Sequence, residues 1–415
     1  MYKKGNVLIT GCIYGAGNIG DEAIFDGLLE ILPKDIRIGT CIDSFPMRYL
    51  ERGVRVFSTA PLGVFQAVLW ADYIILGGAS LLTDPFGPGY PIGFTCGVIR
   101  FARLLKKPCR FVGIGAGRLN DPMSRMLARE CYIYADKFYT RNDLSSSAVV
   151  NELDVARDRV ISMCDPAFLT GGRVDRRLGE KLLDGCGIKR NDGRPVLALS
   201  VVNEGFEVGR DYHQKIAEAC DRLVREIGAR IVFVYSEIRP GPFSDRAAAE
   251  CVKGKMKEAW EEVPPKFFSP EEFSSLLGAF DAVITMRLHV LILASLSGTP
   301  VSVIVREEKV RQILEELGLC EAGTIDRLSA VDLCSSVKSN LASRVAIGEK
   351  LRKQINAVCA RGLSVRDQIM EIDHHKVHSP RRARFKDLAV CTRMLARQLF
   401  RSAWVPLKSM RSTDA

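Results

Sequence analysis

The chain has 415 residues, of which 47% are hydrophobic and 26% are charged, and its formal net charge is +10 at pH 7. This length exceeds that of one ordinary domain and predicts two, and the composition is typical of a globular protein and excludes a disordered one. No apolar run reaches the roughly 20 residues of a membrane span, and no signal sequence precedes the first apolar run, so we expect a cytoplasmic protein.

The thirteen cysteines are scattered, with no C-x-x-C pair and no histidine at ligand spacing. This pattern indicates free thiols in a reducing compartment and argues against a disulfide framework or a zinc site. The histidines at 374, 375 and 378 cluster, but without carboxylate or cysteine ligands at metal spacing. We therefore expect no bound metal ion.

Strand-like runs alternate with helical patterns, which predicts an α/β architecture with parallel sheets covered by helices. In the first half the expected strands are residues 6–10, 36–42, 73–77, 109–115, 137–141 and 159–165. In the second half they are residues 195–202, 230–236, 282–286 and 301–305. A helix is expected from about Leu288 to Ser297, closed by Gly298 and Pro300.

Changes in composition give the expected domain boundaries. A glycine-rich, charged segment at 173–194 is typical of a linker between two Rossmann-like domains, residues 1–172 and 195–327. Beyond residue 327 the strand-like runs stop. We expect a helical region at 328–373 and a basic amphipathic tail at 374–415.

The tail holds almost all of the excess positive charge. From residue 376 to the end there are ten Lys or Arg and two Asp, so this segment carries +8 of the net +10. Apolar residues recur at helical spacing, and three arginines repeat every four residues on another face. Two interpretations stay open: contact of residues 376–411 with an anionic membrane surface, or a helix docked on the protein body. Because the charge is confined to the tail, we expect no nucleic-acid partner.

The first expected strand leads into a glycine-rich stretch, with Gly15, Gly17 and Gly20 on the G-x-G-x-x-G spacing of a dinucleotide site. Asp21 and Glu22 follow at once, and their charge would oppose a pyrophosphate at a helix N-terminus while suiting the helix dipole. The spacing is therefore a weak signal for a nicotinamide cofactor. The two carboxylates are better placed to accept hydrogen bonds from sugar hydroxyls or to act on one.

In open α/β sheets ligands bind at the carboxyl ends of strands, so the residues directly after each strand are candidate site residues. Gly78 and Ser80 follow one expected strand, and Arg141 follows another. Glycine at such a place lets a ligand approach the backbone.

The run Arg287-Leu288-His289 carries the most suggestive chemistry. Arginine offers a planar fork of donors to a phosphate or carboxylate. A helix N-terminus disfavours the cationic form of His289, which keeps the imidazole able to donate or accept a proton. The alternative is structural: a buried histidine at a helix start, with the arginine paired to an acid.

Several stretches in the same order resemble the polysaccharide pyruvyl transferase family. They are GNIGDEAI (17–24), LGGASLLTD (76–84), GIGAG (113–117), RNDLS (141–145), DPAF (165–168) and RLHVLILASLSGTPV (287–301), within residues 6–319. The resemblance implies a GT-B-like pair of Rossmann-type domains facing a cleft, with the acceptor on the N-terminal side and the donor on the C-terminal side. It implies transfer of pyruvate from phosphoenolpyruvate to a sugar as a ketal, in cell-surface polysaccharide biosynthesis.

The resemblance also implies roles for residues of this chain. His289 would protonate the methylene carbon of phosphoenolpyruvate, Arg287 would hold its phosphate or carboxylate, and Asp21 would act on the sugar diol. The substrate-binding residues would be Gly17, Asn18, Glu22, Gly78, Ser80, Arg141 and Leu288. Phosphoenolpyruvate is then a donor substrate, and no cofactor is expected.

One position departs from the family's pattern. Where members usually have arginine in a Ser-Val-Arg run, this chain has Ser-Val-Val, with Val202 in the arginine's place. An expected second anchor for phosphoenolpyruvate is thereby lost. Arg239, Arg306 and Lys309 are the candidates for its replacement.

Two other functions stay open. A glycosyltransferase of the same architecture would bind a nucleotide sugar, with 269–272 as the ribose ligand, although these residues also match a helix capping box. A catalytically silent family member would serve as a scaffold. For the transferase we expect phosphoenolpyruvate and a saccharide acceptor, lipid-linked or otherwise membrane-proximal, and a peripheral location at the inner face of the cell membrane.

Overall fold

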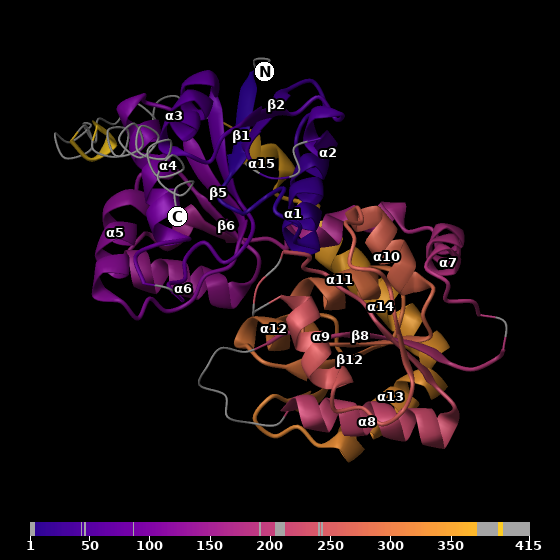
Figure 1. Cartoon of the computed structure of the whole chain (residues 1–415). Helices are drawn as coiled ribbons and strands as arrows, with labels where there is room; N and C mark the ends of the chain where they lie inside the picture. The colour runs from indigo at the N-terminus through magenta and orange to yellow at the C-terminus, as the bar shows by residue number, and fades with distance from the viewer. Residues whose placement is uncertain are drawn as a thin grey trace, which may run out of the picture. The chain divides into compact units, whose positions relative to one another are not determined.

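The computed structural model describes residues 5–42, 44, 47–85, 87–190, 192–203, 212–239, 241, 244–371 and 389–392. These residues form two compact units (Figure 1). The first unit takes the described residues of Met1–Ala16, Ile31–Asp165 and Ser364–Ala415. The second takes those of Gly17–Glu30 and Pro166–Leu363.

The first unit is built on a seven-stranded sheet of order β3-β2-β1-β4-β5-β6-β7, in which every pair is parallel. Its strands are β1 (Asn6–Thr10), β2 (Arg37–Cys41), β3 (Arg55–Phe57), β4 (Tyr73–Gly77), β5 (Cys109–Ile114), β6 (Phe138–Thr140) and β7 (Val160–Ser162). Its helices are α2 (Met47–Leu50), α3 (Pro61–Trp70), α4 (Ile92–Leu104), α5 (Pro122–Tyr132), α6 (Asp143–Leu153), the 3-10 helix η1 (Arg157–Arg159) and α15 (Arg366–Met370).

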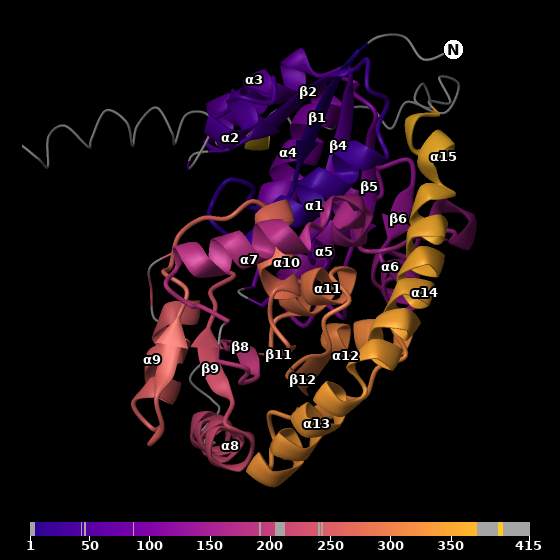
Figure 2. The ribbon, with the colours of Figure 1, turned by 90° about the vertical axis from the view of Figure 1, so that its right-hand side faces the viewer.

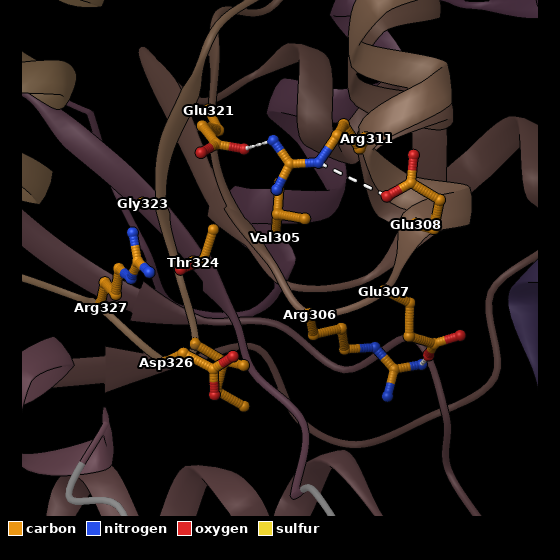
Figure 3. A pocket seen from close by; sticks show the side chains of 11 residues that line it. Val305, Arg306, Glu307, Glu308, Arg311, Glu321, Gly323, Thr324, Asp326 and Arg327 are labelled. Atoms are coloured by element: carbon orange, nitrogen blue, oxygen red, sulfur yellow. Dashed lines mark hydrogen bonds and ion pairs between the residues drawn. The ribbon is translucent and has the colours of Figure 1, made fainter.

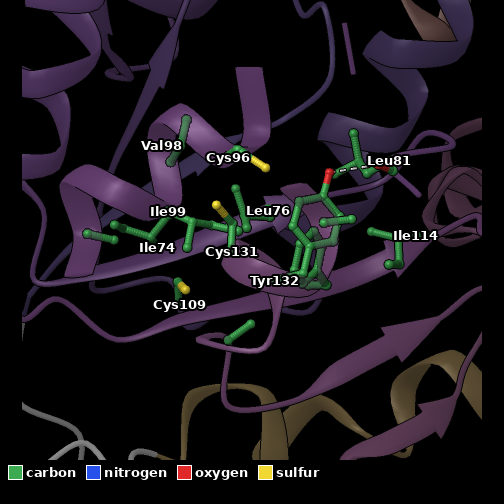
Figure 4. Close-up of a cluster of buried hydrophobic side chains, with 14 of the residues drawn as sticks. Ile74, Leu76, Leu81, Cys96, Val98, Ile99, Cys109, Ile114, Cys131 and Tyr132 are labelled. Atoms are coloured by element: carbon green, nitrogen blue, oxygen red, sulfur yellow. Dashed lines mark hydrogen bonds between the residues drawn. The ribbon is translucent and has the colours of Figure 1, made fainter. Parts of the chain in front are cut away.

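The core of the first unit lies between this sheet and its helices. Figure 4 shows part of it, where Tyr132 packs among aliphatic side chains and its hydroxyl donates to the carbonyl of Leu81 at 2.9 Å. Five cysteines share this core, and all thirteen in the chain are free thiols. The expectation of free rather than disulfide-bonded cysteines is confirmed.

The second unit is built on a six-stranded parallel sheet of order β10-β9-β8-β11-β12-β13. Its strands are β8 (Val196–Ser200), β9 (Arg230–Phe233), β10 (Trp260–Glu262), β11 (Ala282–Thr285), β12 (Val301–Val305) and β13 (Glu321–Thr324). Its helices are α1 (Ile19–Glu30), the 3-10 helix η2 (Pro166–Arg173), α7 (Arg176–Gly185), α8 (Tyr212–Ile227), α9 (Asp245–Lys253), α10 (Pro270–Gly278), α11 (Leu288–Leu296), α12 (Glu308–Glu316), α13 (Ala330–Ala342) and α14 (Arg344–Leu363) (Figure 2).

Helix α1 joins the second unit, although the sequence placed it in the N-terminal domain. It packs closely on η2: a Cβ at Gly27 would lie 1.8 Å from the carbonyl oxygen of Pro166, so only glycine permits this approach. Conversely, residues 364–371 and 389–392 belong to the first unit, where Arg110 donates to the carbonyl of Ile369 at 2.9 Å.

The segment expected as a linker contains helix α7. A Cβ at Gly179 of this helix would lie 1.9 Å from the carbonyl oxygen of Ser275 in α10, so the two helices pack closely.

The expected strands are all present, and three short ones were missed. These are β3, β10 and β13, of three or four residues, which lie at or beside sheet edges and lack an apolar run. The expected helical region contains α13, α14 and α15. Within the described residues, none of the helices combines the length and apolar character needed to span a membrane. Of the expected tail only 389–392 are described, as a helical turn with Cys391 buried in the first unit's core, so the rest of the tail and the histidine cluster lie outside the described residues.

Candidate active site

The carboxyl edge of the second sheet gathers most of the candidate residues. Because all its strands are parallel, the loops after β9, β8, β11, β12 and β13 leave at one edge. The strand order reverses between β8 and β11, which is where open α/β sheets bind ligands. Seven of the ten predicted site residues belong to this unit, namely Gly17, Asn18, Asp21, Glu22, Arg287, Leu288 and His289.

The start of α1 is tied to the loop after β9. The amide of Ile19 donates to the carbonyl of Ser236 at 2.9 Å, and that of Ile238 donates to the carbonyl of Gly17 at 3.0 Å. The side-chain amide of Asn18 donates to Oε2 of Glu237 at 2.9 Å. Glu237, buried at 6% exposure, thus fixes a residue 219 positions earlier in the chain.

Asn18 also caps α1 with its own side chain. Its Oδ1 accepts from the amide of Gly20 at 2.9 Å and from that of Asp21 at 3.4 Å. Two of the amides that a helix N-terminus could offer to a pyrophosphate are therefore occupied. Asp21 and the buried Glu22 add negative charge in the first turn. This geometry supports the interpretation that the glycine spacing is not a dinucleotide site.

Helix α11 begins differently. Arg287 is its N-cap residue, and no side chain caps the helix. Its first internal hydrogen bond runs from the amide of Leu291 to the carbonyl of Arg287 at 3.0 Å. The preceding amides, among them that of Leu288, therefore point out of the helix, where an anion is favoured.

Arg287 forms an ion pair with Asp245, at the start of α9. Its Nε donates to Oδ1 of Asp245 at 2.9 Å and its Nη2 donates to the same oxygen. Oδ2 of Asp245 accepts from the amide and the hydroxyl of Ser236, both at 2.8 Å, and from the amide of Glu237 at 3.1 Å. Asp245 is 1% exposed and Arg287 is 19% exposed. The arginine is thus held by a buried carboxylate, while within the described residues its Nη1 has no partner.

His289 lies against the backbone of α1. A Cβ added to Gly20 would lie 2.1 Å from Nδ1 of His289, so glycine is required for the two helix starts to meet. The imidazole is partly buried. The GDEA and RLH motifs, which are far apart in the sequence, therefore meet in the second unit.

The other three predicted residues, Gly78, Ser80 and Arg141, belong to the first unit. Arg141 is 5% exposed; its Nη1 lies 3.6 Å from Oδ2 of Asp165, which is fully buried. Its Nη2 donates to the hydroxyl of Ser80 at 3.4 Å, and its guanidinium lies over Gly115, where a Cβ would approach to 2.5 Å. This arginine holds the glycine loop after β4 to the ends of the neighbouring strands.

Sequence reasoning missed two residues of the candidate site in the second unit, Glu237 and Asp245. The sequence held one usable signal, because Ser244 caps α9 and places Asp245 in its first turn. Nothing local indicates that these carboxylates meet Asn18 and Arg287.

The position of the missing arginine is buried. Val202 is 4% exposed and packs in the core of the second unit. The three suggested replacements are all ion-paired: Arg239 with Glu237 at 2.5 Å, Lys309 with Glu307 at 2.5 Å, and Arg306 also with Glu307.

The ribose-ligand alternative at residues 269–272 is not supported by the geometry. The amide of Ser269 donates to Oε2 of Glu272 at 2.7 Å, and the amide of Glu272 donates to the hydroxyl of Ser269 at 3.1 Å. Both side chains complete a capping box at the start of α10.

A pocket of about 560 Å³ opens at the ends of β12 and β13 (Figure 3). It is lined by Val305, Arg306, Glu307, Glu308, Arg311, Glu321, Gly323, Thr324, Ile325, Asp326 and Arg327. Sequence reasoning did not find it, because β13 was not recognised as a strand. Across the part of the chain that the structure describes, no group of three His, Cys, Asp or Glu side chains is arranged to hold a metal ion.

A family model described as polysaccharide pyruvyl transferase matches residues 18–319. No curated protein matches the sequence. The chain is also similar in structure to S. aureus MnaA in complex with UDP, with a TM-score of 0.58 and 13% identity over 83% of this chain and 90% of that one. A putative UDP-N-acetylglucosamine 2-epimerase from Listeria monocytogenes gives a TM-score of 0.58 and 14% identity over 88% and 94%. A glycosyltransferase from Rickettsia africae gives a TM-score of 0.56 and 10% identity over 89% of this chain and 100% of that one. At these identities the likeness concerns the fold, which is of the GT-B type with two parallel-sheet units.

Proposed function

Because the chain belongs to the polysaccharide pyruvyl transferase family, we propose that it transfers pyruvate from phosphoenolpyruvate to a saccharide as a ketal. One observation carries the proposal: His289 and Arg287, at the uncapped start of α11, meet the start of α1 with its acidic first turn. A proton donor, an anion site and carboxylates that can accept from hydroxyls are thereby brought together in one unit.

The donor anion is assigned to the start of α11. Arg287 keeps Nη1 for a phosphate or carboxylate oxygen while Asp245 fixes the other edge of its guanidinium. The amide of Leu288 adds a second donor, and the helix dipole favours the negative charge. No second arginine at position 202 is needed if these groups hold the anion.

Proton transfer is assigned to His289, through Nε2, because the Nδ1 side is packed against Gly20. The proton goes to the methylene carbon of phosphoenolpyruvate, which makes the adjacent carbon electrophilic, and a sugar hydroxyl adds there. The bond to the phosphate oxygen then breaks, and the second hydroxyl adds to close the ketal. Of the two hydroxyl protons, one restores His289 and the other leaves with phosphate.

The sugar diol is assigned to the first turn of α1. Asp21 is partly exposed and acts on a hydroxyl, whereas Asn18 caps the turn and Glu22 is buried. For the first unit, taken by itself, the acceptor contacts at Gly78 and Ser80 stay a prediction. Arg141, at 5% exposure, supports their loop rather than reaching the sugar itself.

The test is a reaction of the purified chain with phosphoenolpyruvate and a panel of pyranose acceptors. We expect release of phosphate together with a pyruvyl ketal on the sugar, detected by mass spectrometry, and binding of phosphoenolpyruvate by calorimetry. Binding and turnover of a nucleotide sugar instead would favour the glycosyltransferase. A chain that binds phosphoenolpyruvate but transfers pyruvate to no acceptor would be the silent scaffold.

We also propose that the reaction serves cell-surface polymer assembly at the inner face of the membrane. The basic composition of residues 376–411 supports this, whereas the burial of Cys391 in the first unit's core favours a docked helix at that point. Co-sedimentation with anionic phospholipid vesicles compares the full chain with one that ends at residue 375. Equal pelleting of both would contradict membrane contact through the tail.

A further inference from the structure

The pocket at the ends of β12 and β13 contains none of the residues assigned to the proposed reaction. Its apolar lining is limited to Val305 and Ile325, both at least nine-tenths buried, and Gly323 and Thr324 complete that part of the wall. Charged side chains supply the remainder of the lining (Figure 3). Aromatic side chains, on which a nucleobase would stack, are absent from this lining.

The charges of the pocket nearly cancel. Arg311 pairs with Glu308 at 3.6 Å and with Glu321, and Figure 3 shows it between these two carboxylates. Arg306 pairs with Glu307, as described above. A lining of three arginines and four carboxylates gives no net attraction for a small polyanion such as free phosphate.

Two polar groups of the lining are available to bind a ligand. Within the described residues, the guanidinium of the exposed Arg327 and the hydroxyl of Thr324 have no hydrogen-bond partner. Together with the carboxylates they offer donors and acceptors side by side. Such a set matches the vicinal hydroxyls of a sugar, each of which both donates and accepts.

The pocket begins one strand away from the proposed donor site. Thr285 in β11 is paired with Val303 in β12, so Arg287, two residues further on, comes beside Val305. Neighbouring strands are about 4.8 Å apart. A ligand in the pocket would therefore lie next to phosphoenolpyruvate at the start of α11.

We propose that this pocket is a saccharide subsite that holds one pyranose unit of the acceptor, with Arg327 and Thr324 as its specificity-determining residues. The proposal rests on the proposed function for the identity of the sugar as an acceptor. The volume of 560 Å³ is in the range of small-molecule sites, about 300–1,000 Å³.

The experiment measures sugar binding without the reaction. Saturation-transfer NMR of the full chain is recorded with galactose, glucose, mannose and glucuronate as separate probes, in the absence of phosphoenolpyruvate. We expect at least one probe to bind, and Arg327→Ala and Thr324→Val to weaken it, Arg327→Ala about tenfold or more, since a hydrogen bond to a charged group is lost. The matched control is Arg222→Ala, an arginine of α8 paired with Glu226 at 2.9 Å, which should bind like the wild type.

In the NMR experiment, with UDP added as a further probe, three results would overturn the subsite: no sugar binds, Arg327→Ala binds sugar like Arg222→Ala, or UDP rather than a sugar loses affinity in Arg327→Ala. Calorimetry with phosphoenolpyruvate on the same variants separates this proposal from the proposed function. A loss of phosphoenolpyruvate affinity in Arg327→Ala would make the pocket part of the donor site and end the saccharide assignment. Sugar binding that depends on Arg327, in a chain that forms no ketal, would keep the subsite while contradicting the transferase.

Discussion

Two helix N-termini meet in the second unit, and they differ in capping and in charge. Helix α1 is capped by Asn18 and carries Asp21 and Glu22 in its first turn. Helix α11 has no side-chain cap, no acidic residue in its first turn, and Arg287 as its N-cap residue. The same backbone geometry therefore repels an anion at α1 and attracts one at α11.

The difference teaches that a glycine-rich stretch after a strand is not by itself a phosphate site. At α1, glycine serves close packing, since Gly20 faces His289 and Gly27 faces Pro166. The proposed anion site, at the start of α11, lies where the sequence has no glycine. Capping and charge, rather than glycine spacing, make the start of α11 the more favourable place for a phosphate.

The largest effect is expected from Arg287→Ala. This change leaves the buried carboxylate of Asp245 without its cation, and breaking such a pair costs about 3–5 kcal/mol when both partners are fully buried. Because Arg287 is partly exposed, we expect a fall in the free energy of unfolding near the lower end, about 3 kcal/mol, measured by urea denaturation. Affinity for phosphoenolpyruvate should also be lost, as measured by calorimetry.

The double variant Arg287→Ala, Asp245→Asn separates these two losses. It removes the buried charge, so most of the stability should return while phosphoenolpyruvate binding stays absent. A double variant as unstable as the single one would contradict the assignment of Asp245 as the partner that positions Arg287.

His289→Ala tests the proton donor at the same helix start. Loss of a general acid lowers the rate by about 10²–10⁴-fold, and we expect this loss in kcat with phosphoenolpyruvate affinity changed by less than about threefold. Steady-state release of phosphate measures it. Full turnover by the variant would remove His289 from the mechanism.

Gly20→Ala tests the contact between the two helix starts. The added methyl group would overlap the imidazole of His289, and overpacking of this kind costs about 1–3 kcal/mol. Turnover should fall because the imidazole is displaced. The control is Gly185→Ala in α7, where a Cβ meets nothing within 4 Å, and there stability should be unchanged or slightly raised. Equal behaviour of the two variants would contradict the close contact.

Asn18→Ala is expected to have the smallest effect on stability. Removing a helix cap costs about 1 kcal/mol, measured by urea denaturation. Ser329→Ala is matched to it, because Ser329 caps α13 by accepting from the amide of Asp332 at 3.3 Å. Asn18→Ala should lose more stability than Ser329→Ala, because it also removes the hydrogen bond to Glu237. Only Asn18→Ala should raise KM for the saccharide, since only Asn18 holds the turn that carries Asp21. The same KM in both variants would exclude this turn from the acceptor site.

The sequence determined the α/β architecture, most strand positions, the start of α11 and the capping box of α10, because these depend on local periodicity and on residues within one turn of each other. It also determined the motifs of the family. The three short edge strands were not predicted, since runs of three or four residues are too short to show a period.

Only the tertiary structure decided which unit α1 joins, which acid holds Arg287 and what fixes Asn18. These depend on partners 42 and 219 residues away, Asp245 and Glu237, and no local pattern encodes such pairs. The burial of Val202 and the pocket beside Val305 were likewise decided by the order of strands in the second sheet. Periodicity specifies elements one at a time, whereas a site forms from the residues that packing brings to one edge of a sheet.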